Sequence, residues 1–87
     1  MNSSDIQQKV YQWATESNFT APYGVLMGEG QSSRGKKYKS VTFGRARTLD
    51  CEVQIYNRSF IVVRSSRHGS LTFTSYESLQ EFLNGLS

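Results

Sequence analysis

The chain has 87 residues, of which 37% are apolar and 13% aromatic, enough for one domain with one small core. Charged residues make up 20%, and no apolar run approaches the roughly 18 residues of a membrane span, which excludes a membrane protein. The single cysteine, Cys51, excludes an intrachain disulfide, and residues 1–5 lack the basic and apolar regions of a signal peptide. We therefore expect one domain over residues 1–87, in a cytoplasmic or nuclear protein that is not secreted.

The first predicted element is a helix that begins at Ser4 and ends near Asn18. Ser4 and Gln7 fit the S-x-x-Q capping box, in which both side chains bond to free backbone N–H groups at the helix start. Four apolar residues then repeat at helical spacing and form one stripe: Ile6, Val10, Trp13 and Ala14. Gln7 is assigned to the solvent-facing side of this helix.

A strand is predicted after Pro22, which excludes helix at that point. Its alternating residues are Tyr23, Val25 and Met27. Residues 28–37 are rich in Gly, Ser, Lys and Arg and predict a flexible basic loop, whose cations suit contact with phosphates. The alternative interpretation is a solvated hairpin loop. Residues 38–47 predict the next strand, with two apolar side chains on one face, Val41 and Phe43.

The clearest alternation in the chain predicts a half-buried strand with four residues on its apolar side, Leu49, Cys51, Val53 and Ile55. A turn at residues 57–59 follows, and its length decides the register of the next strand. A two-residue turn leaves Ile61 and Val63 on the outer face and predicts a homodimer contact there. A three-residue turn buries both and places an aromatic and basic platform outside, formed by Tyr56, Phe60, Val62 and Arg64. We favour the longer turn, because Arg58 resists the positive φ that a type I′ turn needs.

A short strand and a helix complete the predicted fold. Leu71 and Phe73 predict the strand, and Thr74 and Glu77 fit a second capping box. The apolar stripe of this helix comprises Tyr76, Leu79, Phe82, Leu83 and Leu86. The order α-β-β-β-β-β-α predicts an α+β fold, with an antiparallel sheet of four or five strands between an N-terminal and a C-terminal helix.

Positive charge is concentrated in the middle of the chain. Nine of the ten Lys and Arg residues lie between residues 34 and 68, where only Asp50 and Glu52 oppose them, so this stretch carries +7 while the chain carries +3. If these cations converge on folding, they would bind the phosphates of a nucleic acid, and exposed aromatic rings would stack on unpaired bases. The candidate nucleic-acid-binding residues are Arg34, Lys36, Lys37, Lys39, Arg45, Arg47, Tyr56, Arg64, Arg67 and His68.

Residues suited to catalysis or metal binding are few. One histidine and one cysteine cannot complete a four-ligand zinc site, and a nucleophile needs an adjacent base. We therefore expect no catalytic residue, no metal site and no cofactor. The leading hypothesis is a non-enzymatic, sequence-tolerant protein that binds DNA or RNA through the backbone. The alternative is a small protein-interaction module, such as a regulator, an inhibitor or a phage-like accessory protein, that docks on an acidic partner.

The order of sheet, loop glycine, short strand and amphipathic helix between Val41 and Leu86 is similar to the single-stranded-DNA-binding transcriptional coactivator family. In that family, dimers bind nucleic-acid strands through a basic sheet. The flanking helices are loosely similar to those of a double-stranded-RNA-binding domain, which has a lysine cluster where this chain has residues 74–77, TSYE. These resemblances imply a nucleic-acid partner and assign no individual residue.

Overall fold

The elements follow one another in the order expected from the sequence. The computed structural model describes residues 1–17, 19, 24–45 and 49–86. Its helices and strands are α1 (Ser3–Glu16), β1 (Leu26–Gln31), β2 (Lys37–Arg45), β3 (Leu49–Asn57), β4 (Phe60–Ser65), β5 (Gly69–Phe73) and α2 (Tyr76–Leu86). Each strand pairs antiparallel with the next, in the spatial order β1-β2-β3-β4-β5. The predicted α+β fold is confirmed, with five strands in the sheet.

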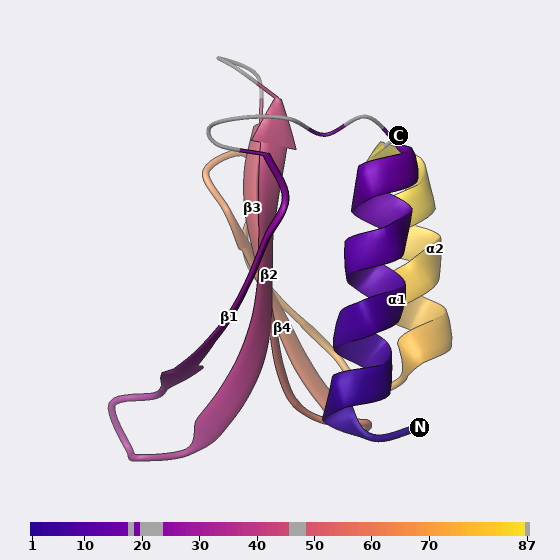
Figure 1. Ribbon diagram of the computed structural model, residues 1–87. Helices are drawn as coiled ribbons and strands as arrows, with labels where there is room; N and C mark the ends of the chain where they lie inside the picture. The colour runs from indigo at the N-terminus through magenta and orange to yellow at the C-terminus, as the bar shows by residue number, and fades with distance from the viewer. Residues whose placement is uncertain (18, 20–23, 46–48, 87) are drawn as a thin grey trace.

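Both helices lie on the same side of the sheet (Figure 1). α1 packs on β1, β2 and β3, and α2 packs on β5. Within the described ranges no helix covers the opposite side, which we call the open face. An antiparallel sheet tolerates this arrangement because alternate side chains face the core and the solvent.

The core fills the space between the helices and the sheet. Side chains that are at most 2% exposed come from both layers and from Phe19, in the segment after α1: Ile6, Val10, Ala14, Phe19, Val41, Phe43, Cys51, Val53, Ile55, Ile61, Val63, Leu79 and Leu83. Those from the strands occupy alternate positions, as the sequence pattern predicts. Burying one Val, Leu, Ile or Phe side chain contributes about 1.5–3 kcal/mol relative to leaving it exposed, so this layer holds both helices on the sheet.

The helix α1 begins earlier than predicted. Asn2 Oδ1 accepts from Asp5 N at 2.9 Å, and Asn2 N donates to Asp5 Oδ2 at 3.4 Å, which together form the capping box. The predicted box that starts at Ser4 is therefore wrong. Asn is as good a cap as Ser, and the Asp5 carboxylate takes the place of the usual Glu or Gln. The predicted helix end at Asn18 lies outside the described residues.

The helix α2 is capped one residue later than predicted. Ser75 Oγ, rather than the hydroxyl of Thr74, accepts from Ser78 N at 3.2 Å. The predicted apolar stripe is confirmed, because all of its members are buried or packed against the core: Tyr76, Leu79, Phe82, Leu83 and Leu86.

Gln7 is buried, and the prediction that it faces solvent is wrong. Its side chain is 9% exposed, and Nε2 donates to two backbone oxygens, Gly28 O and Ser40 O, each at 3.0 Å. A glutamine beside the apolar stripe reaches the sheet here because strand carbonyls lie under it. Gln7 thereby ties α1 to both strands of the β1–β2 hairpin.

The β1–β2 connection is shorter than the predicted loop at residues 28–37. β1 continues through Gln31 and β2 begins at Lys37, which leaves residues 32–36 as the turn. Two backbone hydrogen bonds within these five residues close it. The glycines of β1 still pair with β2. The Gly- and Ser-rich composition, which is typical of a loop, therefore belongs partly to a strand. The predicted loop range of 28–37 is therefore wrong, and the mobility of the loop stays a prediction. The predicted start of the preceding strand, Tyr23, lies outside the described residues.

The β3–β4 hairpin settles the two registers left open by the sequence. Ile61 and Val63 are fully buried and pair with β3 on the helix-facing side. Arg58 and Ser59 form the turn, a bulge lies between Ile55 and Asn57, and Asn57 Oδ1 accepts from Ser59 N at 2.8 Å. The predicted burial of Ile61 and Val63 is confirmed, but the predicted three-residue turn is wrong, because Asn57 pairs with Phe60 and the bulge, not a third turn residue, sets the register. The homodimer contact through Ile61 and Val63 is wrong, because neither side chain reaches the surface.

Candidate nucleic-acid interface

Three aromatic side chains meet on the open face. We call Tyr38 of β2, Tyr56 of β3 and Phe60 of β4 the aromatic cluster. The ring centroids of Tyr38 and Tyr56 lie 5.3 Å apart, and those of Tyr56 and Phe60 lie 5.0 Å apart. Cross-strand aromatic contacts of this kind hold the rings in place. Phe60 is 37% exposed and both tyrosines are half-buried, so part of each ring remains accessible.

A glycine of the edge strand makes room for the Tyr38 ring. Gly30 is the register partner of Tyr38. A Cβ at Gly30 would collide with the ring and the hydroxyl of Tyr38, so the ring lies against the β1 backbone. Glycine inside a strand often marks such a close approach. Gly30 therefore determines where Tyr38 lies in the aromatic cluster.

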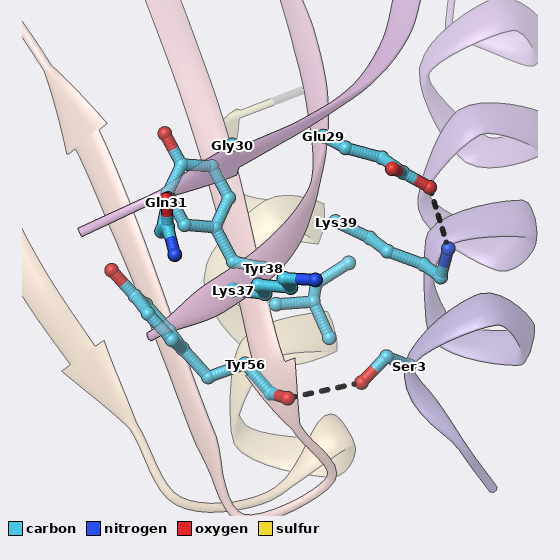
Figure 2. Close-up of a pocket in the computed structure, with 9 residues that line it drawn as sticks. Ser3, Glu29, Gly30, Gln31, Lys37, Tyr38, Lys39 and Tyr56 are labelled. Carbon is cyan, nitrogen blue, oxygen red and sulfur yellow. Dashed lines mark hydrogen bonds and ion pairs between the residues drawn. The ribbon is translucent and has the colours of Figure 1, made fainter. Parts of the chain in front are cut away.

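An open hollow of about 640 Å³ adjoins the aromatic cluster at the end of the β1–β2 hairpin. Figure 2 shows that the rings of Tyr38 and Tyr56 extend away from α1, whereas Lys39 and Glu29 extend toward it. Ser3 Oγ, in the first turn of α1, donates to Tyr56 O at 3.2 Å and ties the helix start to β3 (Figure 2). The volume falls within the range of about 300–1,000 Å³ that ligand pockets occupy.

Two lysines line this hollow and differ in their pairing. Lys39 Nζ lies 3.0 Å from Glu29 Oε1. The hydrogen bond from Lys39, together with its charge, holds the pKa of the Glu29 carboxyl below its usual range. Lys37 is exposed and forms no ion pair in the described part of the chain. Lys37 is therefore available to an anion, whereas Lys39 already has a carboxylate partner.

Exposed cations flank the aromatic cluster in two turns. In an antiparallel meander the β1–β2 and β3–β4 connections lie at the same end of the sheet. Arg34 and Lys36 lie in the first of them, Arg58 lies in the second, and all three side chains are exposed. Across the described ranges none of the three forms an ion pair. We call residues 32–36 and 58–59 the basic turns.

The other predicted cations lie away from this end. Arg67 and His68 occupy the β4–β5 turn, at the opposite end of the sheet. The His68 ring contacts the Phe82 ring of α2 edge-on, with centroids 5.5 Å apart. Arg45 is the last residue of β2, at that far end, while its side chain and the whole of Arg47 lie outside what the structure describes. The predicted residues that are described therefore do not form one surface.

Arg64 projects from the middle of the open face, between the two ends of the sheet. Its Nε donates to Gln54 Oε1 at 3.3 Å. Gln54 Nε2 in turn donates to Glu52 Oε1 at 3.0 Å. Of the predicted residues, then, Tyr56 and Arg64 share the open face, and Arg34 and Lys36 lie in the turn at its aromatic end. Lys37 and Lys39 belong to the helix-facing side of β2, because they alternate with Tyr38 and share the parity of the buried Val41.

Four residues of the site lie outside the predicted set: Gly30, Tyr38, Arg58 and Phe60. The position of Tyr38 is the least evident of these from the sequence. A glycine inside a strand was the available signal, since it often accompanies a bulky neighbour on the next strand. The pairing of Gly30 with Tyr38 depends on a turn at residues 32–36. A predicted loop at residues 28–37 places Gly30 outside any strand and so conceals that pairing.

The buried thiol has the chemistry of a core residue. Cys51 is 2% exposed, and burial, followed by the nearby charge of Asp50, raises the pKa of the thiol to about 11. Asp50 accepts hydrogen bonds from the hydroxyl and the backbone N–H of Ser66, which lower the pKa of that carboxyl. In the described residues no three His, Cys, Asp or Glu side chains gather where they could hold a metal ion.

Neither of the two described helices is long and apolar enough to cross a lipid bilayer. The chain matches no protein-family model, no curated protein and no solved structure. Its function must therefore be inferred from the geometry of the aromatic cluster, the basic turns and the open face.

Proposed function

We propose that this protein binds single-stranded nucleic acid, without requiring a particular sequence, at the aromatic end of the open face. The observation that carries the proposal is the position of the aromatic cluster, three touching rings on a face that the helices leave uncovered. The basic turns place three unpaired cations at the same end: Arg34, Lys36 and Arg58. Sites for single-stranded nucleic acid combine aromatic rings that stack on the bases with cations that contact the phosphates.

Each part acts on a different portion of the nucleic acid. Stacking of an unpaired base on an aromatic side chain contributes about 1–3 kcal/mol and tolerates any base, since every base has a flat face. The bases of a duplex are stacked on one another and offer no such face. Long cationic side chains in turns adapt to the irregular backbone of a single strand and position it without reading its sequence. Both features favour single strands over duplexes.

Binding to labelled oligonucleotides tests this proposal. Fluorescence anisotropy with a dT 12-mer, a U 12-mer and a duplex of equal length should give the tightest Kd for a single strand. With three phosphate contacts and a slope of about −0.7 each, the Kd should weaken about 20-fold between roughly 50 and 200 mM salt. Comparison of the dT and U strands distinguishes DNA from RNA. The proposal fails if no strand binds at the lower salt concentration, where electrostatic affinity is greatest.

The Tyr56 ring offers a matched pair of variants for the same assay. Tyr56→Ala should weaken single-strand binding about 5- to 150-fold, because it removes one stacking surface of about 1–3 kcal/mol. Tyr56→Phe keeps the ring and should restore most of that loss. Equal binding by the Ala and Phe variants would mean that the ring is not a stacking surface.

A second candidate function is the protein-interaction module that docks on an acidic partner. It is favoured by two exposed apolar side chains on the edge strand β1, Leu26 at 47% and Met27 at 44%. Edge strands with exposed apolar residues are common contact surfaces for other chains. A pull-down that yields one stoichiometric protein, unchanged by nuclease treatment, would favour this function. Homodimer formation and cytoplasmic or nuclear location stay predictions.

A further inference from the structure

Three polar side chains form a connected group in the middle of the open face. Glu52 and Arg64 are direct register partners on β3 and β4. Glu52 and Arg64 form no ion pair with each other. The ion pair found among the described residues joins Lys39 to Glu29. Gln54 connects them instead, accepting from Arg64 Nε at 3.3 Å and donating to Glu52 Oε1 at 3.0 Å. We call Glu52, Gln54 and Arg64 the polar triad.

The amide of Gln54 holds the two charged groups in a fixed relation. Gln54 is only 6% exposed, so its position is set by packing within the sheet. Arg64 is exposed and Glu52 half-buried, so both charged groups remain within reach of solvent. A carboxylate has about four lone-pair sites and a guanidinium five N–H donors, and Gln54 uses one of each. Most of the hydrogen-bonding capacity of the pair is left for a ligand.

An open hollow of about 470 Å³ lies over this part of the sheet. Besides Glu52 and Arg64 its wall includes two hydroxyl side chains that are their neighbours in register, Thr42 on β2 and Ser70 on β5. The hollow is thus lined by two carboxylates, Asp50 and Glu52, by one guanidinium and by hydroxyl groups. Asp50 already accepts from the backbone N–H and the hydroxyl of Ser66, so Glu52 is the carboxylate with more acceptor sites left for a ligand. Such a set suits a flat polar group that carries donors and an acceptor on one edge.

We propose that the polar triad reads a guanine base of the bound strand, an inference that rests on the proposed function. The Watson–Crick edge of guanine carries two adjacent N–H donors beside one oxygen acceptor. The Glu52 carboxylate accepts from the two donors, and Arg64 donates to the oxygen. Gln54 is a positioning residue, because it keeps Glu52 and Arg64 from closing on each other.

The other bases match this arrangement less well. A carboxylate only accepts, so it pairs best with two donors side by side, and of the four bases guanine alone presents them on this edge. Cytosine offers one donor group beside two acceptors, and adenine one donor group beside one acceptor. Uracil and thymine offer a single ring N–H between two oxygens. Guanine therefore satisfies the most hydrogen-bonding groups of the polar triad.

The polar triad and the aromatic cluster lie along one path over the open face. Tyr56, Gln54 and Glu52 occupy alternate positions of β3, so the carboxylate is four residues from the aromatic ring. Four residues of extended strand span about 13 Å. One strand of nucleic acid would thus meet the basic turns, then the aromatic cluster and then the polar triad. The guanine preference is added to sequence-tolerant binding and does not replace it.

Strands that differ only in one kind of base test the inference. The probes are a dT 12-mer and the same strand with three isolated thymines replaced by guanine, cytosine, adenine or inosine. Fluorescence anisotropy should give a Kd about tenfold lower for the guanine strand than for the dT strand. The inosine strand should lose most of that gain, because inosine lacks the 2-amino group that Glu52 accepts from. Equal affinity for the guanine and inosine strands, or a stronger gain with another base, would overturn the inference.

Variants of the polar triad give a second readout. Glu52→Gln should bring the ratio of guanine to dT affinity close to one, because an amide cannot accept from both donors. Glu81→Gln, on the solvent side of α2, removes the same charge far from the site and should keep the ratio. Thermal unfolding confirms that both variants are folded. A guanine preference that survives Glu52→Gln rejects the inference.

The outcomes separate this inference from the proposed function. If the dT strand binds but guanine brings no gain, the inference falls and the proposed function stands. If no strand binds wild-type protein, both fall together.

Discussion

The two faces of the sheet are built from neighbouring residues and have opposite properties. Val53 and Ile55 are fully buried under the helices, whereas Gln54 and Tyr56 belong to the open face with its polar and aromatic contacts. Successive side chains of a strand point to opposite sides, so one strand serves both purposes. Residues for stability and residues for the proposed binding therefore lie on opposite sides of the same strands, and substitutions at adjacent positions can separate the two roles.

The largest expected effect comes from a pair of adjacent residues on β4. Ile61→Ala should lower the free energy of unfolding by about 2–5 kcal/mol, because it opens a cavity in a fully buried site. Val62→Ala, one position away on the open face and half-buried, should cost less than about 1 kcal/mol. Urea unfolding followed by circular dichroism measures both. Similar losses for the two variants would mean that the open face contributes to the core.

The buried glutamine of α1 should give the next largest effect. Gln7→Ala leaves Gly28 O and Ser40 O without their side-chain donor, and one buried unsatisfied group costs about 1–3 kcal/mol. We expect a loss of stability of about 2 kcal/mol and faster amide exchange in the β1–β2 hairpin. The matched control is Gln8→Ala, because Gln8 is the exposed neighbour. Hydrogen exchange in β1 that is the same in both variants would contradict the role of Gln7.

A smaller effect, on binding alone, is expected at the first basic turn. Arg34→Glu combined with Lys36→Glu should weaken binding of a dT 12-mer about tenfold at roughly 50 mM salt. The slope of log Kd against log salt should fall by about 1.4, or 0.7 for each lost phosphate contact. Lys9→Glu, on exposed helix surface, is the control for a change in net charge. If Lys9→Glu weakens binding as much, overall charge rather than the basic turn governs affinity.

The smallest effect concerns the reactivity of Cys51 on the helix-facing side. Burial raises the pKa of this thiol from 9.0 to about 11, so at pH 8 the folded protein holds almost no thiolate. Alkylation by iodoacetamide should be much slower in the native protein than in urea. The corresponding contribution to stability is present below pH 9.0 and is lost as the pH rises through about 11. Equal alkylation rates in the native and unfolded states would show that the thiol is accessible.

Local periodicity determined most of the fold. The alternation through Val53 and Ile55 and the helical stripe through Leu79 and Leu83 identify elements that the structure contains. The side of β4 that is buried was predicted correctly, as Ile61 shows, but the bulge before Asn57 and the two-residue turn that produce this register were not. Both capping boxes were misplaced by one or two residues, because several polar residues near each helix start have suitable side chains.

Only part of the candidate site could be predicted from local sequence pattern. Tyr56 and Arg64 were identified as outward-facing, because their parity follows from the buried residues beside them. Tyr38 was missed, because its place against Gly30 depends on a turn length that composition obscured. The sequence shows that residues 34–68 carry a net positive charge. It does not show that the cations of this stretch lie at two opposite ends of the sheet.

The pattern of apolar residues was sufficient to predict the type and order of the helices and strands and the apolar side of most strands, since these depend on neighbours a few positions away. Packing of elements that are distant in sequence sets which turns share an end of the sheet, how Gln7 reaches two strands, and how Gln54 hydrogen-bonds to both Glu52 and Arg64. Those contacts join residues on different elements, and they depend on strand register and on the side from which the helices pack.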